Sequence, residues 1–195
     1  CWLLQACKTD QPGGDENEVE TLIVHVGPNP DTIDPALNSA VDGGTLIIHA
    51  FEGLMTLDKE GKPIPGQAES YEVSEDGLVY TFKLREGLKW SDGKPLTAED
   101  FVYSWNRAID PETAADYEYI FDVIDGYDEG ELNVVAEDDR TLKVTLKAPT
   151  PYFLELTAFP TYAPVRKDII EQYNETWATK PETYIGNGPY KMIEW

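Results

Sequence analysis

Residues 68–107, AESYEVSEDGLVYTFKLREGLKWSDGKPLTAEDFVYSWNR, carry the clearest structural pattern in the sequence. The first half of this stretch contains two strand-like segments, 68–74 and 78–85, separated by Glu-Asp-Gly at 75–77. In the second segment apolar and polar residues alternate, which is typical of an antiparallel strand with one buried face. The pattern therefore predicts a β-hairpin.

The second half of the stretch predicts an amphipathic helix that begins after Thr97. Threonine is a favourable N-cap, and Asp100 stands three residues later, where an acidic side chain completes a capping box. Asp110 precedes a proline and so ends the helix, because that position disfavours the helical conformation. The apolar residues recur on one stripe, at Phe101, Val102, Trp105, Ala108 and Ile109.

Short strands and helices continue on both sides of this stretch. We expect further strands at 21–26, 54–57, 63–65, 132–136, 141–146 and 190–195, and helices at 43–51, 117–124, 151–159 and 167–173. Hairpins that alternate with short helices predict the α+β fold class.

The composition excludes several functional classes. The chain has 195 residues, of which 37 are acidic and 15 basic, so its formal net charge is −22. An average apolar content together with this charge excludes a disordered chain and a multi-span membrane protein. Because so negative a surface repels phosphate backbones, we expect no nucleic-acid partner.

The amino-terminal residues resemble the end of a bacterial lipoprotein signal peptide. Six largely apolar residues precede Cys7, and Leu-Gln-Ala-Cys at 4–7 resembles a lipobox. We therefore expect residues 1–7 to be a signal-peptide remnant, Cys7 to carry a lipid, and residues 8–20 to form a flexible acidic tether. The alternatives are a Cys1–Cys7 disulfide or two inert thiols.

The sequence offers little catalytic or metal-binding chemistry. It contains no Gly-rich phosphate loop, nucleophile elbow, His-Glu-x-x-His or Cys-x-x-Cys motif. His25 and His49 are far apart and are interpreted as packed or surface histidines. Residues 122–131 are acidic, but they lack the glycine and the final glutamate of a calcium loop. We expect no catalytic residue, no metal site and no cofactor.

Five blocks of sequence resemble the extracellular solute-binding proteins of family 5, the oligopeptide- and dipeptide-binding components of ABC importers. Residues 68–107 match an "AESW" segment, a "YTFKLR" strand, "KWSDG" and "PLTAEDFVYSW", with Tyr71 in place of the common tryptophan. The remaining blocks are Thr32-Ile33-Asp34-Pro35, Phe51-Glu52-Gly53-Leu54, Ala148-Pro149-Thr150-Pro151-Tyr152-Phe153 and Gly186-Asn187-Gly188-Pro189-Tyr190.

This resemblance implies a periplasmic-binding-protein-like fold of type II, in the three-domain class. Residues 21–53 and 183–195 would form part of lobe one, and residues 54–182 would form the inserted domain. The second lobe would lie outside this sequence. The apolar stretch that ends at Trp195 leads us to expect the amino-terminal part of a longer protein.

The resemblance also implies a small set of ligand-binding residues. The backbone of Ser39, Ala40 and Val41 would pair with an extended peptide, and Tyr117 would line a side-chain pocket. The alternatives are that residues 39–41 form an ordinary loop and that Tyr117 is a core or surface aromatic residue.

Together these features predict a non-enzymatic, lipid-anchored receptor outside the cytoplasm. It would capture oligopeptides as a monomer and deliver them to an ABC permease in the membrane. One alternative is a family member with other cargo, namely nickel, haem, a sugar or a peptide pheromone. Another is a secreted hydrolase, for which we find no nucleophile and base pair.

Overall fold

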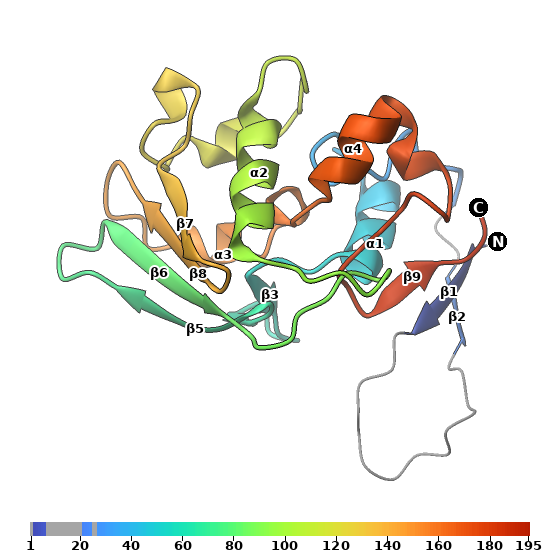
Figure 1. The fold of residues 1–195 in the computed structure, drawn as a ribbon, viewed down its shortest axis with the longest axis horizontal. Helices are drawn as coiled ribbons and strands as arrows, with labels where there is room; N and C mark the ends of the chain where they lie inside the picture. The colour runs from blue at the N-terminus through green and yellow to red at the C-terminus, as the bar shows by residue number, and fades with distance from the viewer. Residues whose placement is uncertain (1, 7–20, 25–26) are drawn as a thin grey trace, which may run out of the picture.

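The computed structural model of the chain describes residues 2–6, 21–24 and 27–195. Figure 1 shows a four-stranded antiparallel sheet toward one end of the molecule, crossed by the longest helix, α2. The strand order in this sheet is β5-β6-β8-β7. The strands are β5 (Ala68–Val73), β6 (Val79–Leu84), β7 (Val134–Asp138) and β8 (Thr141–Thr145), and α2 spans Ala98–Ile109. The fold is mixed α and β, as the sequence predicts.

The hairpin and the helix predicted from residues 68–107 are both confirmed. Strand β6 alternates buried and half-buried side chains along its length, and α2 packs against β7 and β8. Apolar side chains from the two layers meet in one core, because each element has a single apolar face. The buried members include Tyr80, Phe82, Leu84, Phe101, Trp105, Ala108, Leu142 and Val144.

The predicted capping box is present at the start of α2. The backbone N–H of Thr97 donates to Asp100 Oδ2 over 2.8 Å, and the Thr97 side chain caps the third residue of the helix. Burial raises the pKa of the Asp100 carboxyl above its ordinary value. The helix ends at Ile109, just before Asp110 and its following proline.

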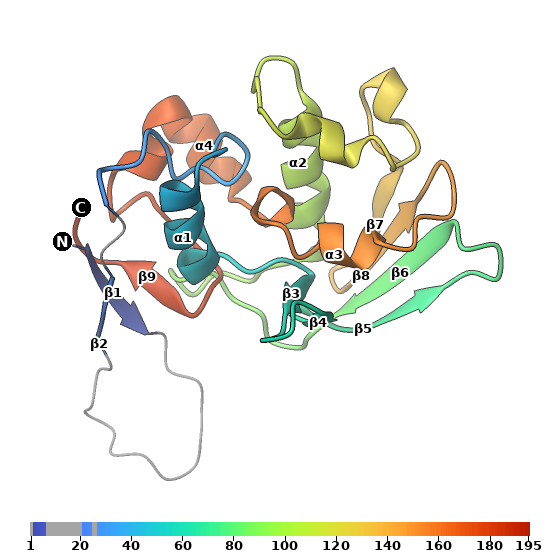
Figure 2. The same cartoon turned by 180° about the vertical axis from the view of Figure 1, so that it is seen from behind.

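The other end of the molecule holds a three-stranded sheet and two helices (Figure 2). There, β1 (Trp2–Ala6), β2 (Thr21–Val24) and β9 (Tyr190–Met192) form an antiparallel sheet in the order β2-β1-β9. Helices α1 (Val41–Ala50) and α4 (Lys167–Tyr173) lie beside it. A small hairpin of β3 (Met55–Leu57) and β4 (Pro63–Pro65) lies between the two ends.

Several amino-terminal predictions lie outside the described residues. Cys7, the tether at 8–20 and His25 are among them, so lipidation and the alternative disulfide stay predictions. Strand β1 falls within residues 1–7, where the sequence predicts a signal-peptide remnant, and that assignment also stays a prediction. No helix in the described part of the chain is long and apolar enough to cross a membrane.

Two predicted helices are shorter than the sequence indicates. Residues 117–124 give only the 3₁₀ turn Glu118–Phe121, and residues 151–159 give only α3 (Phe153–Leu156). In the first case Ile124 forms a β-bridge with Leu146, and in the second the Thr157 carbonyl accepts a bond from the N–H of Met55. Tertiary pairing therefore overrides local helical preference. Further 3₁₀ turns span Tyr127–Glu129, Pro160–Tyr162 and Asn174–Thr179.

The sequence blocks 51–54 and 186–190, which are distant in the chain, meet in the structure and are joined by hydrogen bonds. Asn187 donates from Nδ2 to the Glu52 carbonyl over 2.9 Å, and its Oδ1 accepts from the Glu52 N–H over 3.1 Å. The N–H of Gly188 donates to the Ala50 carbonyl over 2.8 Å. A Cβ at Gly186 would lie 2.0 Å from that carbonyl oxygen, so only glycine allows the two chains to approach this closely.

A buried arginine ties the start of α4 to the turn before α2. The Arg166 side chain is 5% exposed and donates to both carboxylate oxygens of Asp168, at 2.7 and 2.6 Å. It also donates to Asp92 Oδ2 over 2.9 Å. These bonds from Arg166 hold the pKa of Asp168 well below its ordinary value.

We expect Asp168→Asn to lower the free energy of unfolding at neutral pH by about 1 kcal/mol, since the carboxylate is half exposed. Because the folded-state pKa is depressed, this contribution is present above the unfolded value of 3.8 and is lost as the pH falls through the folded value. Urea denaturation at a series of pH values tests this. A difference between wild type and variant that persists undiminished in strong acid would contradict it.

Candidate functional site

The segment that leads into α1 is shaped by the Asp34 side chain. Asp34 Oδ1 accepts from the N–H of Ala36 over 2.9 Å, and the Asp34 carbonyl accepts from the N–H groups of Leu37 and Asn38. This turn is followed by Ala40, whose extended backbone (φ −109°, ψ 150°) makes it the N-cap of α1. The turn thus delivers residues 39–41 to the helix start in an exposed position.

Several backbone groups of residues 39–41 are free to bind a ligand. Among the described residues, the N–H groups of Ser39, Ala40 and Val41 and the carbonyl of Ser39 have no hydrogen-bond partner. The Ala40 carbonyl is already used, because it accepts from Asn38 Nδ2 and from the N–H of Gly44. The first N–H groups of a helix lack internal partners, which accounts for the free N–H of Val41 at the start of α1.

The structure brings the two predicted ligand segments together. The hydroxyl of Ser39 donates to Asp116 Oδ2 over 2.6 Å, across 77 residues of sequence. Asp116 directly precedes Tyr117, so this bond joins the 39–41 loop to the segment that carries the predicted pocket aromatic residue. We call residues 39–41, 116 and 117 together the candidate edge.

An aromatic group borders the candidate edge. The half-buried Tyr117 ring packs edge-on against Phe159, with 5.4 Å between ring centroids, and lies tilted against Tyr119, with 6.1 Å between centroids. Phe159 and Tyr119 are 40% and 56% exposed. Sequence reasoning missed Asp116, Phe159 and Tyr119. Asp116 and Tyr119 lie next to Tyr117 in the chain and could have been suspected, whereas no local signal pointed to Phe159.

The buried Asn38 side chain supports the loop of the candidate edge. It is 9% exposed, and its side chain bonds the Ala40 carbonyl while packing closely on Gly43. A Cβ at Gly43 would lie 2.1 Å from Asn38 Oδ1 and 2.6 Å from the Thr32 carbonyl oxygen. At Gly44 the nearest atom to a Cβ would be Asn38 Nδ2, at an ordinary 3.5 Å.

The neighbouring glycines of α1 therefore give a matched pair of variants. We expect Gly43→Ala to lower the free energy of unfolding by about 1–3 kcal/mol, because the methyl group overpacks the contact with Asn38. We expect Gly44→Ala to raise it by about 0.5–1 kcal/mol, because alanine is the better helix former and has room. Thermal denaturation of both variants tests whether the two changes in stability have opposite signs. Equal changes would contradict the difference in space around Gly43 and Gly44.

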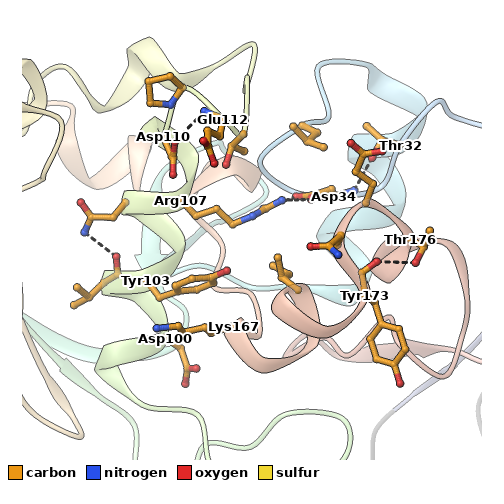
Figure 3. Close-up of a pocket in the computed structure, with 18 of the residues that line it drawn as sticks. Thr32, Asp34, Asp100, Tyr103, Arg107, Asp110, Glu112, Lys167, Tyr173 and Thr176 are labelled. Atoms are coloured by element: carbon orange, nitrogen blue, oxygen red, sulfur yellow. Dashed lines mark hydrogen bonds and ion pairs between the residues drawn. The ribbon is translucent and has the colours of Figure 1, made fainter.

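A large cavity borders α2, and no residue of the candidate edge lines it. It measures about 1710 Å³ and separates α2 from the 31–37 segment and α4. Figure 3 shows Arg107 extending from α2 to Asp34 across this space, with Tyr103, Lys167 and Tyr173 around it. None of Ser39, Ala40, Val41 and Tyr117 lines the cavity.

The ion pair between Asp34 and Arg107 connects the two ends of the molecule. Arg107 donates to both carboxylate oxygens, at 3.0 and 2.6 Å, and the indole N–H of Trp177 donates to Asp34 Oδ2 over 2.9 Å. The Asp34 side chain is only 3% exposed. This arrangement fixes the turn before residues 39–41 to α2 and to the segment after α4.

The remaining titratable candidates are engaged in local contacts. His49 Nδ1 lies 2.6 Å from the Thr45 carbonyl oxygen, and its ring lies beside Tyr190. In the acidic stretch 122–131, Asp125 accepts from Asn133, and Asp128 pairs with Lys147. Within the described ranges, no group of three or more His, Cys, Asp or Glu side chains could hold a metal ion.

A comparison with protein-family models finds one match. The model described as "Bacterial extracellular solute-binding proteins, family 5 Middle" matches residues 62–195. Among curated proteins, the oligopeptide-binding protein OppA of Bacillus subtilis is 43% identical over 185 residues, which cover 90% of this chain and 34% of that protein. The periplasmic oligopeptide-binding protein OppA of Escherichia coli is 42% identical over 188 residues, covering 91% of this chain and 34% of that protein.

Solved structures give the same picture for the fold. Listeria monocytogenes OppA bound to peptide superposes with a TM-score of 0.83 at 39% identity, covering 86% of this chain and 35% of that one. Haemophilus influenzae OppA in complex with the peptide RPPGFSPFR gives a TM-score of 0.82 at 37% identity, covering 87% and 35%. The chain thus spans about a third of the length of these relatives.

Proposed function

Because this chain belongs to the bacterial extracellular solute-binding proteins of family 5, we propose that its candidate edge forms one wall of a site that captures oligopeptides. The observation that supports this is the set of N–H groups at Ser39, Ala40 and Val41 that have no partner among the described residues, in a loop that the Ser39–Asp116 hydrogen bond ties to the segment of Tyr117. The captured peptide would be released to an ABC permease in the membrane.

The free backbone groups suit an extended peptide. A peptide backbone offers a carbonyl and an N–H at every residue, and pairing along an exposed edge uses these groups without reading side chains. The donors at residues 39–41 and the Ser39 carbonyl can engage such a backbone directly. Affinity would then depend little on the peptide sequence.

The aromatic border supplies contact for peptide side chains. Tyr117, Tyr119 and Phe159 form one aromatic group, and Tyr117 directly follows Asp116, the hydrogen-bond partner of Ser39. Aromatic rings give large apolar contact, and tyrosine adds a hydroxyl group that can bond polar side chains. This combination suits a pocket that accepts many residue types. The remaining walls of the site would come from segments outside these 195 residues.

The anchoring part of the proposal rests on Cys7. A diacylated cysteine gives stable attachment to a bilayer, whereas a single chain is marginal. Mass spectrometry of the protein purified from membranes tests it. We expect a lipid-modified amino-terminal Cys7 peptide and release of a Cys7→Ser variant into the soluble fraction. An unmodified Cys7 in the membrane-purified protein would refute the anchor.

The variant Val41→Pro, made in the full-length gene product, tests the backbone pairing with a bound peptide. Proline at the first position of a helix removes one N–H without disturbing the helix, and the extended Ala40 before it is compatible with proline. Val41→Ala is the matched control, because it keeps the N–H and the side chain is 88% exposed in any case.

We expect calorimetry with short peptides to show saturable binding to the wild type and to Val41→Ala. Val41→Pro should bind roughly 2- to 10-fold more weakly, the loss that corresponds to one hydrogen bond of about 0.5–1.5 kcal/mol. Absence of heat with every peptide pool would refute peptide capture. If Val41→Pro binds peptide as tightly as the wild type, pairing through the Val41 N–H is refuted, whereas pairing through the other donors is not.

A further inference from the structure

One carboxylate on the candidate edge has spare binding capacity. Asp116 is exposed and accepts a single hydrogen bond, from the Ser39 hydroxyl to Oδ2. Among the described residues its other oxygen, Oδ1, has no partner, and no Lys or Arg forms an ion pair with it. An ionised carboxylate can accept about four hydrogen bonds, so most of its capacity is unused.

Two further acidic residues lie on the segments that carry the candidate edge. Asp42 lies in the first turn of α1, three residues after Ser39, and Glu118 follows Asp116 by two residues. Arg107 on α2 is engaged by the buried Asp34 and is not free to pair with these carboxylates. Clustered negative charge raises the local concentration of cationic ligands.

The Ser39 hydrogen bond also fixes where this charge is placed. It ties the carboxylate to the residue that begins the row of free backbone donors. A peptide paired with residues 39–41 must therefore place one of its residues beside Asp116. Neither the backbone donors nor the aromatic border carries a formal charge, so Asp116 is the group of the candidate edge that can distinguish charged from neutral cargo.

We propose that Asp116 is a specificity determinant that favours peptides with a cationic nitrogen at the position facing Ser39. This inference rests on the proposed function of the candidate edge. The nitrogen can be a Lys or Arg side chain or the amino-terminal ammonium group, and both would form a charge-assisted hydrogen bond with Oδ1. The Ser39 hydroxyl acts as a positioning group that orients the carboxylate.

The test compares peptides of one length in the gene product in full. A neutral alanine peptide is measured against variants in which each alanine in turn is replaced by lysine, and each peptide is used with free and acetylated amino termini. We expect the best lysine peptide to bind about 2- to 5-fold more tightly than the neutral one, the range of an exposed ion pair. This ratio should fall as salt is added.

Asp116→Asn is the decisive variant. Asparagine keeps an oxygen that can accept from Ser39 but removes the charge, so the affinity ratio of lysine to neutral peptide should fall to about one. Glu86→Gln is the matched control, because it removes one charge from an exposed residue in the loop after β6. The ratio should be unchanged in that variant.

The outcomes separate the two proposals. If neutral peptides bind but Asp116→Asn changes neither the lysine-to-neutral affinity ratio nor the affinity ratio of free to acetylated peptides, the role of Asp116 is refuted and peptide capture stands. If no peptide binds, both fail together. A lysine preference that is lost in Asp116→Asn identifies the side chain as the partner, and a preference for free over acetylated amino termini that is lost in this variant identifies the terminal ammonium group.

Discussion

Replacing Arg107 by leucine is expected to lower the free energy of unfolding by about 3–5 kcal/mol, the cost of leaving a buried charge without its partner. Both terminal nitrogens of Arg107 donate hydrogen bonds to Asp34, whose side chain is 3% exposed. Trp177 and the N–H of Ala36 would remain as donors to the carboxylate, but neither carries a positive charge. Denaturant unfolding of the purified protein measures the loss.

Two controls isolate the buried charge as the cause. Lys62→Leu removes the cation of an exposed pair with Glu60 and should cost less than about 1 kcal/mol. Asp34→Asn combined with Arg107→Leu should be more stable than Arg107→Leu alone, because the uncompensated charge is gone while an acceptor remains for Trp177. If Arg107→Leu costs no more than Lys62→Leu, the ion pair does not join the two ends of the molecule.

Replacing Trp105 by alanine is expected to cost about 3–5 kcal/mol, the range for deletion of a fully buried tryptophan. Trp105 is 0% exposed and packs edge-on against Tyr162, with 4.9 Å between ring centroids. Its indole N–H donates to the Tyr162 carbonyl over 2.9 Å. The variant therefore opens a cavity under α2 and leaves a buried carbonyl oxygen without its donor.

Trp105→Phe separates the two contributions. It keeps most of the aromatic contact but loses the indole donor, so we expect a smaller cost of about 1–3 kcal/mol. Tyr152→Ala, at a side chain that is 55% exposed, should change stability by less than about 0.5 kcal/mol. If Trp105→Ala and Tyr152→Ala lower thermal stability by similar amounts, Trp105 is not a buried core residue under α2.

Local sequence patterns predicted the elements whose stability is decided locally. The alternation in β6 and the cap and apolar stripe of α2 each appear within a dozen residues, and both elements formed as expected. The predicted helices at 117–124 and 151–159 were too long. Their ends are set by Leu146 and Met55, which are distant in sequence, and a local pattern does not contain such contacts.

The same limit applies to the candidate edge. Its backbone donors and Tyr117 were identified through the resemblance to a known family, not through periodicity or spacing. The bond from Ser39 to Asp116 and the packing of Phe159 on Tyr117 join residues far apart in the chain. Asp34 illustrates the same point, because its partners Arg107 and Trp177 are 73 and 143 residues away.

The central claim is that the N–H groups of residues 39–41 pair with the backbone of a bound peptide. Hydrogen exchange at Ser39, Ala40 and Val41, measured in the gene product in full with and without saturating peptide, tests it most directly. We predict fast exchange of these amides in the free protein and marked slowing when peptide is bound. Unchanged exchange at all three, with slowing confined to the walls of the cavity around Tyr103 and Arg107, would contradict the claim.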